Sequence, residues 1–87
     1  MPCTVKLIGF ARARECLETN SAIDLIVKED WTRASLLLDH LCELYPNLQQ
    51  LKPTLILAIN EEYVMSDSNV SLKNDDTIAL IPPITGG

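Results

Sequence analysis

With 87 residues, an apolar fraction of 47% and a net charge of −5, the chain has the size of one small domain and enough apolar side chains for a single core. The acidic balance argues against nucleic acid as a partner, because phosphates call for a basic surface. No apolar run approaches the roughly 20 residues that span a bilayer, and residues 1–6 lack the layout of a signal peptide, so we expect a cytoplasmic protein that binds no membrane.

The first part of the chain predicts two strands joined by a short helix. Residues 3–9 and 21–27 are rich in apolar and β-branched side chains, as strands are. Between them, residues 10–19 show helical spacing of apolar side chains. The apolar face of this short helix consists of Phe10, Ala13 and Leu17. Because the two strands are close in sequence, we expect them to pair antiparallel.

The main helix is predicted over residues 31–45. Apolar residues recur there at intervals of three and four, which makes one face that must lie on a sheet. Asp30 or Thr32 is a candidate N-cap, and Pro46 ends the helix because proline cannot continue it. His40 lies on the opposite, polar face, where we expect it to be solvated.

A hairpin is predicted after the main helix. Residues 54–59 form a nearly continuous apolar run, as in a central strand that is buried on both faces. Asn60 and Glu61 form a candidate two-residue turn, in which Asn tolerates a positive φ more readily than Glu does. Residues 62–65 would then be a short return strand at a sheet edge.

The last strand is predicted over residues 77–81, after a turn at 73–76. The order of elements is strand, short helix, strand, long helix, strand, short strand, strand. One long helix on a mixed sheet of four to five strands predicts an α+β roll of the β-grasp (ubiquitin-like) type. We expect residues 1–81 to form a single domain and residues 82–87 to be a flexible, functional tail.

The C-terminal run of residues 82–87, PPITGG, is the candidate functional site. The two prolines stop the strand and stiffen the root of the tail toward polyproline II. The two glycines lack a Cβ, so this backbone can thread a narrow channel, and the run could reach roughly 20 Å when extended. The chemical group that the tail offers is its terminal carboxylate, so we expect the carboxylate of Gly87 to be the reacting group.

The rest of the sequence shows no motif for a metal site or a catalytic site. The chain has three cysteines and one histidine, whereas a structural zinc site needs about four ligands, so we expect no metal. The widely spaced cysteines, expected to be reduced thiols, are Cys3, Cys16 and Cys42. The sequence has no Gly-rich phosphate loop and no nucleophile motif. We expect the acidic pairs at 61–62 and 75–76 to be solvated and Trp31 to pack in the core.

A β-grasp domain with this C-terminus resembles the small, sulfur-carrier subunits of molybdopterin synthase. That family ends in P-P-(V/I)-(S/T)-G-G, which residues 82–87 match throughout. Residues 10–15 resemble its F-A-x-x-R-E stretch, and residues 58–64 resemble its A-V-N-x-E-Y-V hairpin. The family commonly has Gly-Asp-Glu before the last strand, where residues 75–77 are Asp-Asp-Thr, so we expect Asn74 to take the positive-φ position.

The resemblance implies a carrier mechanism. A ubiquitin-E1-like activating enzyme would adenylate Gly87 with ATP, and sulfur would then replace AMP to leave a C-terminal thiocarboxylate. The loaded tail would insert into the large subunit of the synthase, within a heterotetramer, and donate sulfur to a pterin precursor to form the dithiolene of molybdopterin. The chain itself would bind no cofactor, and the catalytic groups would belong to the partner.

The resemblance also implies a set of partner contacts. The residues expected to contact the large subunit are Phe10, Ile81, Pro82, Pro83, Ile84, Thr85 and Gly86. Met65 is a further candidate for this apolar surface.

Three rival functions remain open. A ubiquitin-like protein modifier would join its C-terminal Gly-Gly to lysine side chains of target proteins. A sulfur carrier for thiamine or tRNA thiolation would use the same adenylated terminus with another acceptor. A plain protein-interaction domain would leave the tail idle. Conjugates, a copurifying pterin-binding subunit, or unchanged activity after removal of the two glycines would tell these functions apart.

Overall fold

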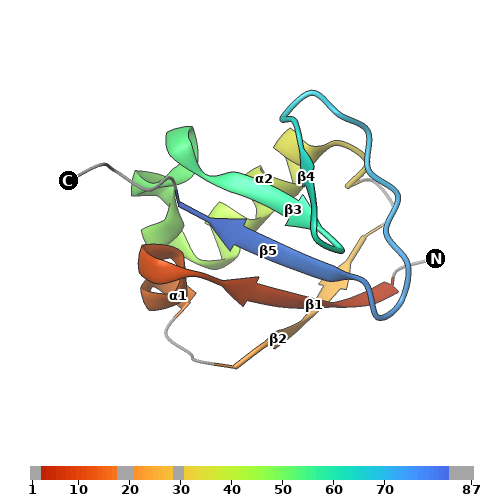
Figure 1. Cartoon of the computed structure of the whole chain (residues 1–87), viewed down its shortest axis with the longest axis horizontal. Coiled ribbons are helices and arrows are strands. Elements are labelled where there is room, and N and C mark those ends of the chain that lie inside the picture. The colour runs from red at the N-terminus through yellow and green to blue at the C-terminus, as the bar shows by residue number, and fades with distance from the viewer. Residues whose placement is uncertain (1–2, 18–20, 29–30, 83–87) are drawn as a thin grey trace.

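The computed structural model describes residues 3–17, 21–28 and 31–82. It confirms the predicted α+β fold: a mixed five-stranded sheet in the order β2-β1-β5-β3-β4, with the helices packed on it (Figure 1). The strands are β1 (Cys3–Gly9), β2 (Ile23–Val27), β3 (Ile56–Ile59), β4 (Glu62–Val64) and β5 (Thr77–Ile81). The helices are α1 (Ala11–Leu17), α2 (Ala34–Leu44) and the short 3-10 helices η1 (Pro46–Gln50) and η2 (Lys52–Thr54).

The last strand, β5, lies at the centre of the sheet. It pairs parallel with β1 on one side and antiparallel with β3 on the other (Figure 1). The outer pairs are antiparallel, with β2 on β1, as predicted, and β4 on β3. Two parallel neighbouring strands must be joined by a long crossover connection. The chain between β1 and β5, which contains the main helix, forms this connection.

The prediction that residues 54–59 form the central strand, buried on both faces, is wrong in part. The strand is interior to the sheet, but it begins at Ile56, because Lys52–Thr54 form η2. Leu57 and Ala58 are buried, whereas Ile56 remains 38% exposed. Ile56 lies on the face of the sheet opposite the helices, where Ala58 is covered but the start of β3 is only partly covered.

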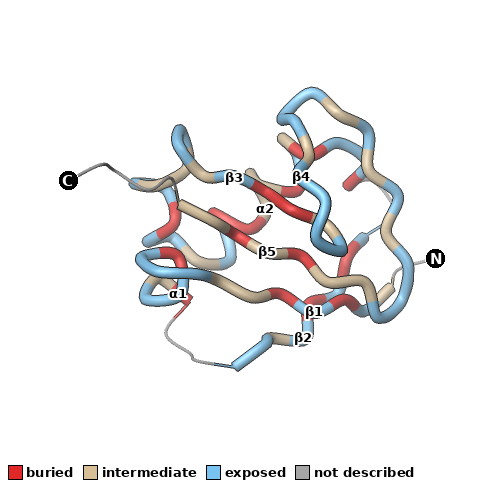
Figure 2. The backbone as a smooth tube through the Cα atoms, viewed as in Figure 1, coloured by how far each residue is buried: buried red, intermediate tan, exposed pale blue. Residues whose placement is uncertain are grey.

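The core lies between the sheet and the helices. Strand side chains alternate between this layer and the opposite face, as the period of two in a strand requires, and Figure 2 shows the alternation of burial along β1 and β5. The fully buried large side chains are Val5, Leu7, Leu37, Leu41, Cys42, Leu48, Ile78 and Leu80. They come from β1, β5, α2 and η1, so one cluster joins sheet and helices.

The N-terminus of α2 is capped by a distant loop, not by the predicted side chains. Arg33 is the N-cap residue and makes no side-chain cap, and the helix begins at Ala34. The N–H groups of Ala34 and Ser35 donate to the carbonyl oxygens of Ser68 and Ser66, each at 3.0 Å. These bonds satisfy donors that a helix leaves open at its start. Asp30, the other predicted cap, lies outside the described residues.

The C-terminal end of α2 and the position of Trp31 agree with the sequence analysis. The helix ends at Leu44, with Tyr45 as C-cap, and Pro46 starts η1. Trp31 is 7% exposed and joins the core. The prediction that His40 is solvated is wrong in part: 34% of its side chain is exposed, but its ring stacks on the indole of Trp31 with centroids 4.4 Å apart. The indole covers one face of the imidazole and leaves it half-buried.

The junction between β1 and α1 is tight. A Cβ added at Gly9 would lie 2.8 Å from the backbone nitrogen of Arg14 and 3.0 Å from the carbonyl carbon of Ala13. Ala11 takes a φ of 49°, in the left-handed region that disfavours residues with a Cβ. The chain therefore turns sharply at the end of β1, and the glycine allows α1 to approach the strand.

Replacing Gly9 by alanine tests this close approach. Because the new methyl group would meet backbone atoms of α1, which cannot move aside as a side-chain tip can, we expect Gly9→Ala to lower the free energy of unfolding by about 1–3 kcal/mol. The measurement is urea unfolding followed by circular dichroism. The control is Ala11→Gly, which relieves the left-handed backbone and should stay within about 0.5 kcal/mol of wild type or exceed it. Equal stability of Gly9→Ala and wild type would contradict the packing described.

Candidate functional site

The strand that leads to the predicted reacting group ends beside the start of α1. Because β5 and β1 run parallel, their C-terminal ends lie at the same edge of the sheet (Figure 1). The N–H of Phe10 donates to the carbonyl oxygen of Leu80 at 3.0 Å, which ties the two chain segments together there. Ile81 closes β5, and Pro82 follows it half-buried.

Most of the predicted tail lies outside the described residues. Those predicted site residues are Pro83, Ile84, Thr85, Gly86 and Gly87. Their roles therefore stay predictions. The structure does place the root of the tail: Pro82 leaves the central strand of the sheet, next to the apolar surface described below.

The face of the sheet opposite the helices, here called the open face, is largely apolar. Its apolar residues near the end of β5 are Ile8, Phe10, Ile56, Ala58, Tyr63, Ala79 and Ile81. Cross-strand neighbours bring them together, with Ile8 beside Ala79 and Ile56 beside Ile81. Tyr63 is 75% exposed and Phe10 is 49% exposed. A contiguous exposed apolar surface of this kind is typical of a protein interface.

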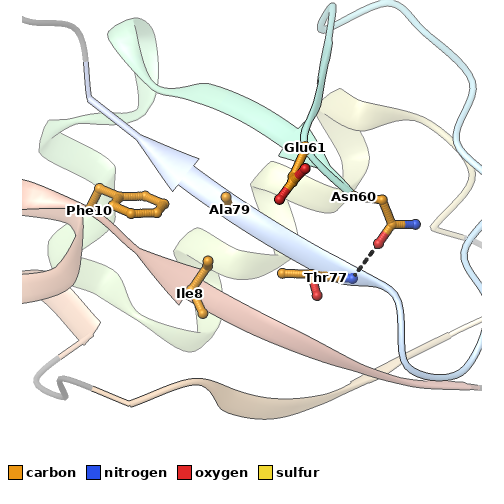
Figure 3. Close-up of a pocket in the computed structure, with 6 residues that line it drawn as sticks. All are labelled: Ile8, Phe10, Asn60, Glu61, Thr77 and Ala79. Atoms are coloured by element: carbon orange, nitrogen blue, oxygen red, sulfur yellow. Dashed lines mark hydrogen bonds between the residues drawn. The ribbon is translucent and has the colours of Figure 1, made fainter.

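Phe10 is not on the buried face of the short helix, as the spacing predicted. It precedes α1 and points to the open face, where its ring is directed toward Ala79 (Figure 3). The physical reason is the sharp turn at Ala11, which takes Phe10 out of helical geometry, while the carbonyl oxygen of Phe10 accepts from the N–H of Ala13 at 3.0 Å. Ala13 and Leu17 do form the buried face of α1.

A pocket of about 390 Å³ indents the open face. It is lined by Ile8, Phe10, Asn60, Glu61, Thr77 and Ala79 (Figure 3). Phe10 and Glu61 point toward Ala79 from opposite sides. The pocket therefore combines an apolar floor, an aromatic ring and a carboxylate at its rim.

A polar network fixes the β3–β4 turn above this pocket. The side-chain oxygen of Asn60 accepts from the N–H of Thr77 at 2.9 Å, and its amide nitrogen donates to Asp76 at 3.0 Å. The other carboxylate oxygen of Asp76 accepts from the N–H of Lys73 at 2.8 Å. The hydrogen bond from Asn60, followed by that from Lys73, lowers the pKa of Asp76 below its ordinary value of 3.8.

Two turns hold non-glycine residues at positive φ. Asn60 has a φ of 51° and Glu61 a φ of 71°, which confirms the predicted two-residue turn. In the turn before β5 the positive φ falls on Asp75, at 72°, and not on the predicted Asn74. The reason is a contact with β1: the side-chain oxygen of Asn74 accepts from the N–H of Thr4, and the N–H of Asp75 donates to the carbonyl of Thr4.

Several residues of the open face and of its pocket were missed by the sequence analysis. Ile8, Ile56, Tyr63 and Glu61 were assigned to strands or a turn and not to a site. The sequence does carry a signal for this surface. Apolar residues occur on both faces of β1 and β5, and only one face of each strand can pack on the helices. Met65, the further candidate, is 72% exposed just after β4.

The described residues hold no metal-binding cluster and no membrane-spanning helix. They hold no group of three or more His, Cys, Asp or Glu side chains placed to bind a metal ion. The helices within the described ranges are also too short or too polar to cross a bilayer. All three cysteines are free thiols, and burial raises the pKa of Cys42.

Comparison with known proteins gives a consistent family match. A sequence profile of the ThiS family matches residues 8–87. The molybdopterin synthase sulfur carrier subunit of Anopheles gambiae is 39% identical over 84 residues, which is 95% of this chain and 91% of that protein.

Solved structures show the same fold. The small archaeal modifier protein 1 of Methanosarcina acetivorans superposes with a TM-score of 0.74 at 23% identity, over 100% of this chain and 99% of that one. A chain in the complex of subunits 1 and 2 of the molybdopterin-converting factor of Helicobacter pylori superposes with a TM-score of 0.62 at 20% identity, over 97% and 99%. At these identities the likeness concerns the fold alone.

The network at Asp76 predicts a pH-dependent stability. The pKa of Asp76 is lower in the folded protein than in the unfolded chain. The ionised carboxylate therefore contributes fully to the free energy of unfolding when the pH is above its pKa in the unfolded chain, about 4. This contribution is lost as the pH falls through its pKa in the folded protein. We expect Asp76→Asn to be less stable than wild type by about 1 kcal/mol at pH 7, and this difference to shrink below about pH 4.

The measurement is the free energy of unfolding of both proteins between neutral and acid pH. Asp67→Asn is the control, since Asp67 is exposed and accepts no hydrogen bond within the described part of the chain. A difference between wild type and Asp76→Asn that stays constant down to the lowest pH would contradict the role given to the ionised carboxylate.

Proposed function

The chain belongs to the ThiS family, and from that premise we propose that it is the sulfur carrier subunit of a molybdopterin synthase, with the carboxylate of Gly87 carrying the sulfur. The observation that supports this most is a likeness that covers nearly the whole chain and extends through the terminal Gly-Gly. The position of Pro82, at the end of the central strand, supports a tail that is presented from a firmly held root.

The proposed chemistry begins with activation of the terminus. A carboxylate is a poor electrophile at neutral pH, because its charge repels nucleophiles and oxide is a bad leaving group. An E1-like activating enzyme would let a carboxylate oxygen of Gly87 attack the α-phosphate of ATP, with pyrophosphate as leaving group. A sulfur nucleophile would then displace AMP from the acyl adenylate. The product is the thiocarboxylate, which can donate its sulfur to a pterin precursor.

The proposed partner is the large subunit of the synthase, in a heterotetramer. The open face supplies an apolar surface of the kind that interfaces bury, and it lies next to the root of the tail. Phe10, Ile81 and Tyr63 would anchor this surface while the tail enters the active site of the partner. The Helicobacter pylori structure, in which subunits 1 and 2 of the molybdopterin-converting factor form one complex, supports such an assembly.

A second candidate function is that of a protein modifier. The similarity in fold to a small archaeal modifier protein favours it, and the same activated carboxylate of Gly87 would form an isopeptide bond with lysine in place of a thiocarboxylate. The two functions differ in their products and so can be distinguished directly.

The mass of the protein purified from its native cells separates these functions. We expect a species heavier by about 16 Da, the difference between sulfur and oxygen, with the added mass in the terminal peptide after fragmentation. Fragmentation is needed because oxidation of Met or Cys adds nearly the same mass. An unmodified terminus together with lysine-linked conjugates would overturn the sulfur-carrier proposal in favour of the modifier.

A substitution in the tail tests whether folding and sulfur transfer are separate. We expect Gly86→Val to leave the unfolding temperature within about 1 °C of wild type, because tail residues are predicted to lie outside the core. We also expect it to abolish sulfur transfer, because a branched side chain would block passage through a narrow channel. Thr85→Ser is the control and should stay active. Full activity of Gly86→Val would show that the tail needs no such channel.

A further inference from the structure

The pocket on the open face has the shape and chemistry of a receptor for one long side chain. Ile8 and Ala79 form an apolar floor, as neighbours in the β1–β5 pair. The Phe10 ring stands at one side of this floor and the Glu61 carboxylate at the other (Figure 3). An occupant that crosses the pocket would therefore meet hydrocarbon along its length and a negative charge at one end.

The carboxylate of Glu61 is available to such an occupant. The ion pairs found among the described residues are Lys6–Asp24, His40–Glu43 and Lys52–Asp39. Within that part of the chain, Glu61 therefore pairs with no cation. Lys6 lies on the same face of the sheet, but Asp24 already holds its ammonium group.

The backbone holds Glu61 in this place at some cost. Its φ of 71° lies in the left-handed region, where glycine would be free of strain. The hydrogen bonds of Asn60 to Thr77 and Asp76 keep the turn fixed above the pocket. A strained residue that carries a charge beside an apolar hollow is a candidate for recognition.

We propose that this pocket receives a basic side chain, lysine or arginine, of the large synthase subunit; the inference rests on the function proposed above. The aliphatic stem would lie on Ile8 and Ala79, and the cation would bind the carboxylate of Glu61. The Phe10 ring, at the other side of the floor, would pack against the aliphatic stem. The net charge of −5 favours a basic partner surface. A charged contact inside an apolar interface fixes its register and excludes wrong partners.

The test compares two neighbouring carboxylates. Glu61→Gln and Glu62→Gln each remove one negative charge at adjacent positions, but Glu62 lies in β4, does not line this pocket and borders a different hollow with Asn69 and Val70. The measurement is isothermal titration of the whole chain with the purified large subunit of the same organism. We expect Glu61→Gln to raise Kd about tenfold and Glu62→Gln to change it less than about twofold.

Phe10→Leu provides a second, independent measurement. It keeps an apolar side chain and removes the ring against which the stem would pack, so we expect Kd to rise about threefold. If one basic side chain contacts both residues, the combined effect of Glu61→Gln and Phe10→Leu will be smaller than the product of the single effects. Unfolding temperatures equal to wild type will show that the variants are folded.

The outcomes separate this inference from the function on which it rests. Equal Kd changes for Glu61→Gln and Glu62→Gln, with a wild-type complex formed, would overturn the basic-side-chain pocket and leave the carrier function standing. Independent, multiplicative effects of the two pocket variants would also overturn the shared occupant. Failure of the wild-type chain to bind the large subunit at all would overturn both.

Discussion

The parallel pairing of β5 with β1 is the constraint on which the rest of the structure depends. It places the last strand in the middle of the sheet, where Ile78 and Leu80 are fully buried. It also brings the end of β5 beside the end of β1, so that Phe10 and the root of the tail share one edge. Strand β5 is held by hydrogen bonds on both sides, and a carrier can therefore present the tail that follows it from a fixed root.

Successive side chains of a strand point to opposite faces of the sheet. Alternate residues of one strand can therefore stabilise the core and form a recognition surface. In β5, Ile78 and Leu80 face the helices, whereas Ala79 and Ile81 face the open side. Ile78 and Leu80 therefore stabilise the fold, whereas Ala79 and Ile81 belong to the proposed binding surface, although both sets are neighbours in sequence. A strand carries apolar residues on both faces when one face packs in the core and the other forms an interface, as proposed here for β5.

The hydrogen bonds that hold the turns lie at the end of the sheet opposite the tail. There the turn at Asn60 is bonded to the start of β5, and the turn at Asp75 is bonded to β1. Three residues at positive φ lie in these turns, and hydrogen bonds between distant segments hold them. These hydrogen bonds hold one side of the pocket, at Asn60 and Thr77, and the apolar edge near Ile81 is the proposed contact with the partner.

The sequence by itself determined the elements whose signals are local. It predicted β1 and β5 with the bounds found, the end of α2 before Pro46, and the turn at Asn60, because alternation, proline chemistry and turn preferences act between near neighbours. Tertiary structure alone decided that β5 is central, that Phe10 faces outward and that loop carbonyls cap α2. Each of these depends on contacts between segments far apart in the chain, which no local pattern encodes. The pocket is likewise decided by tertiary structure, since Ile8, Glu61 and Ala79 come together only when the sheet has formed.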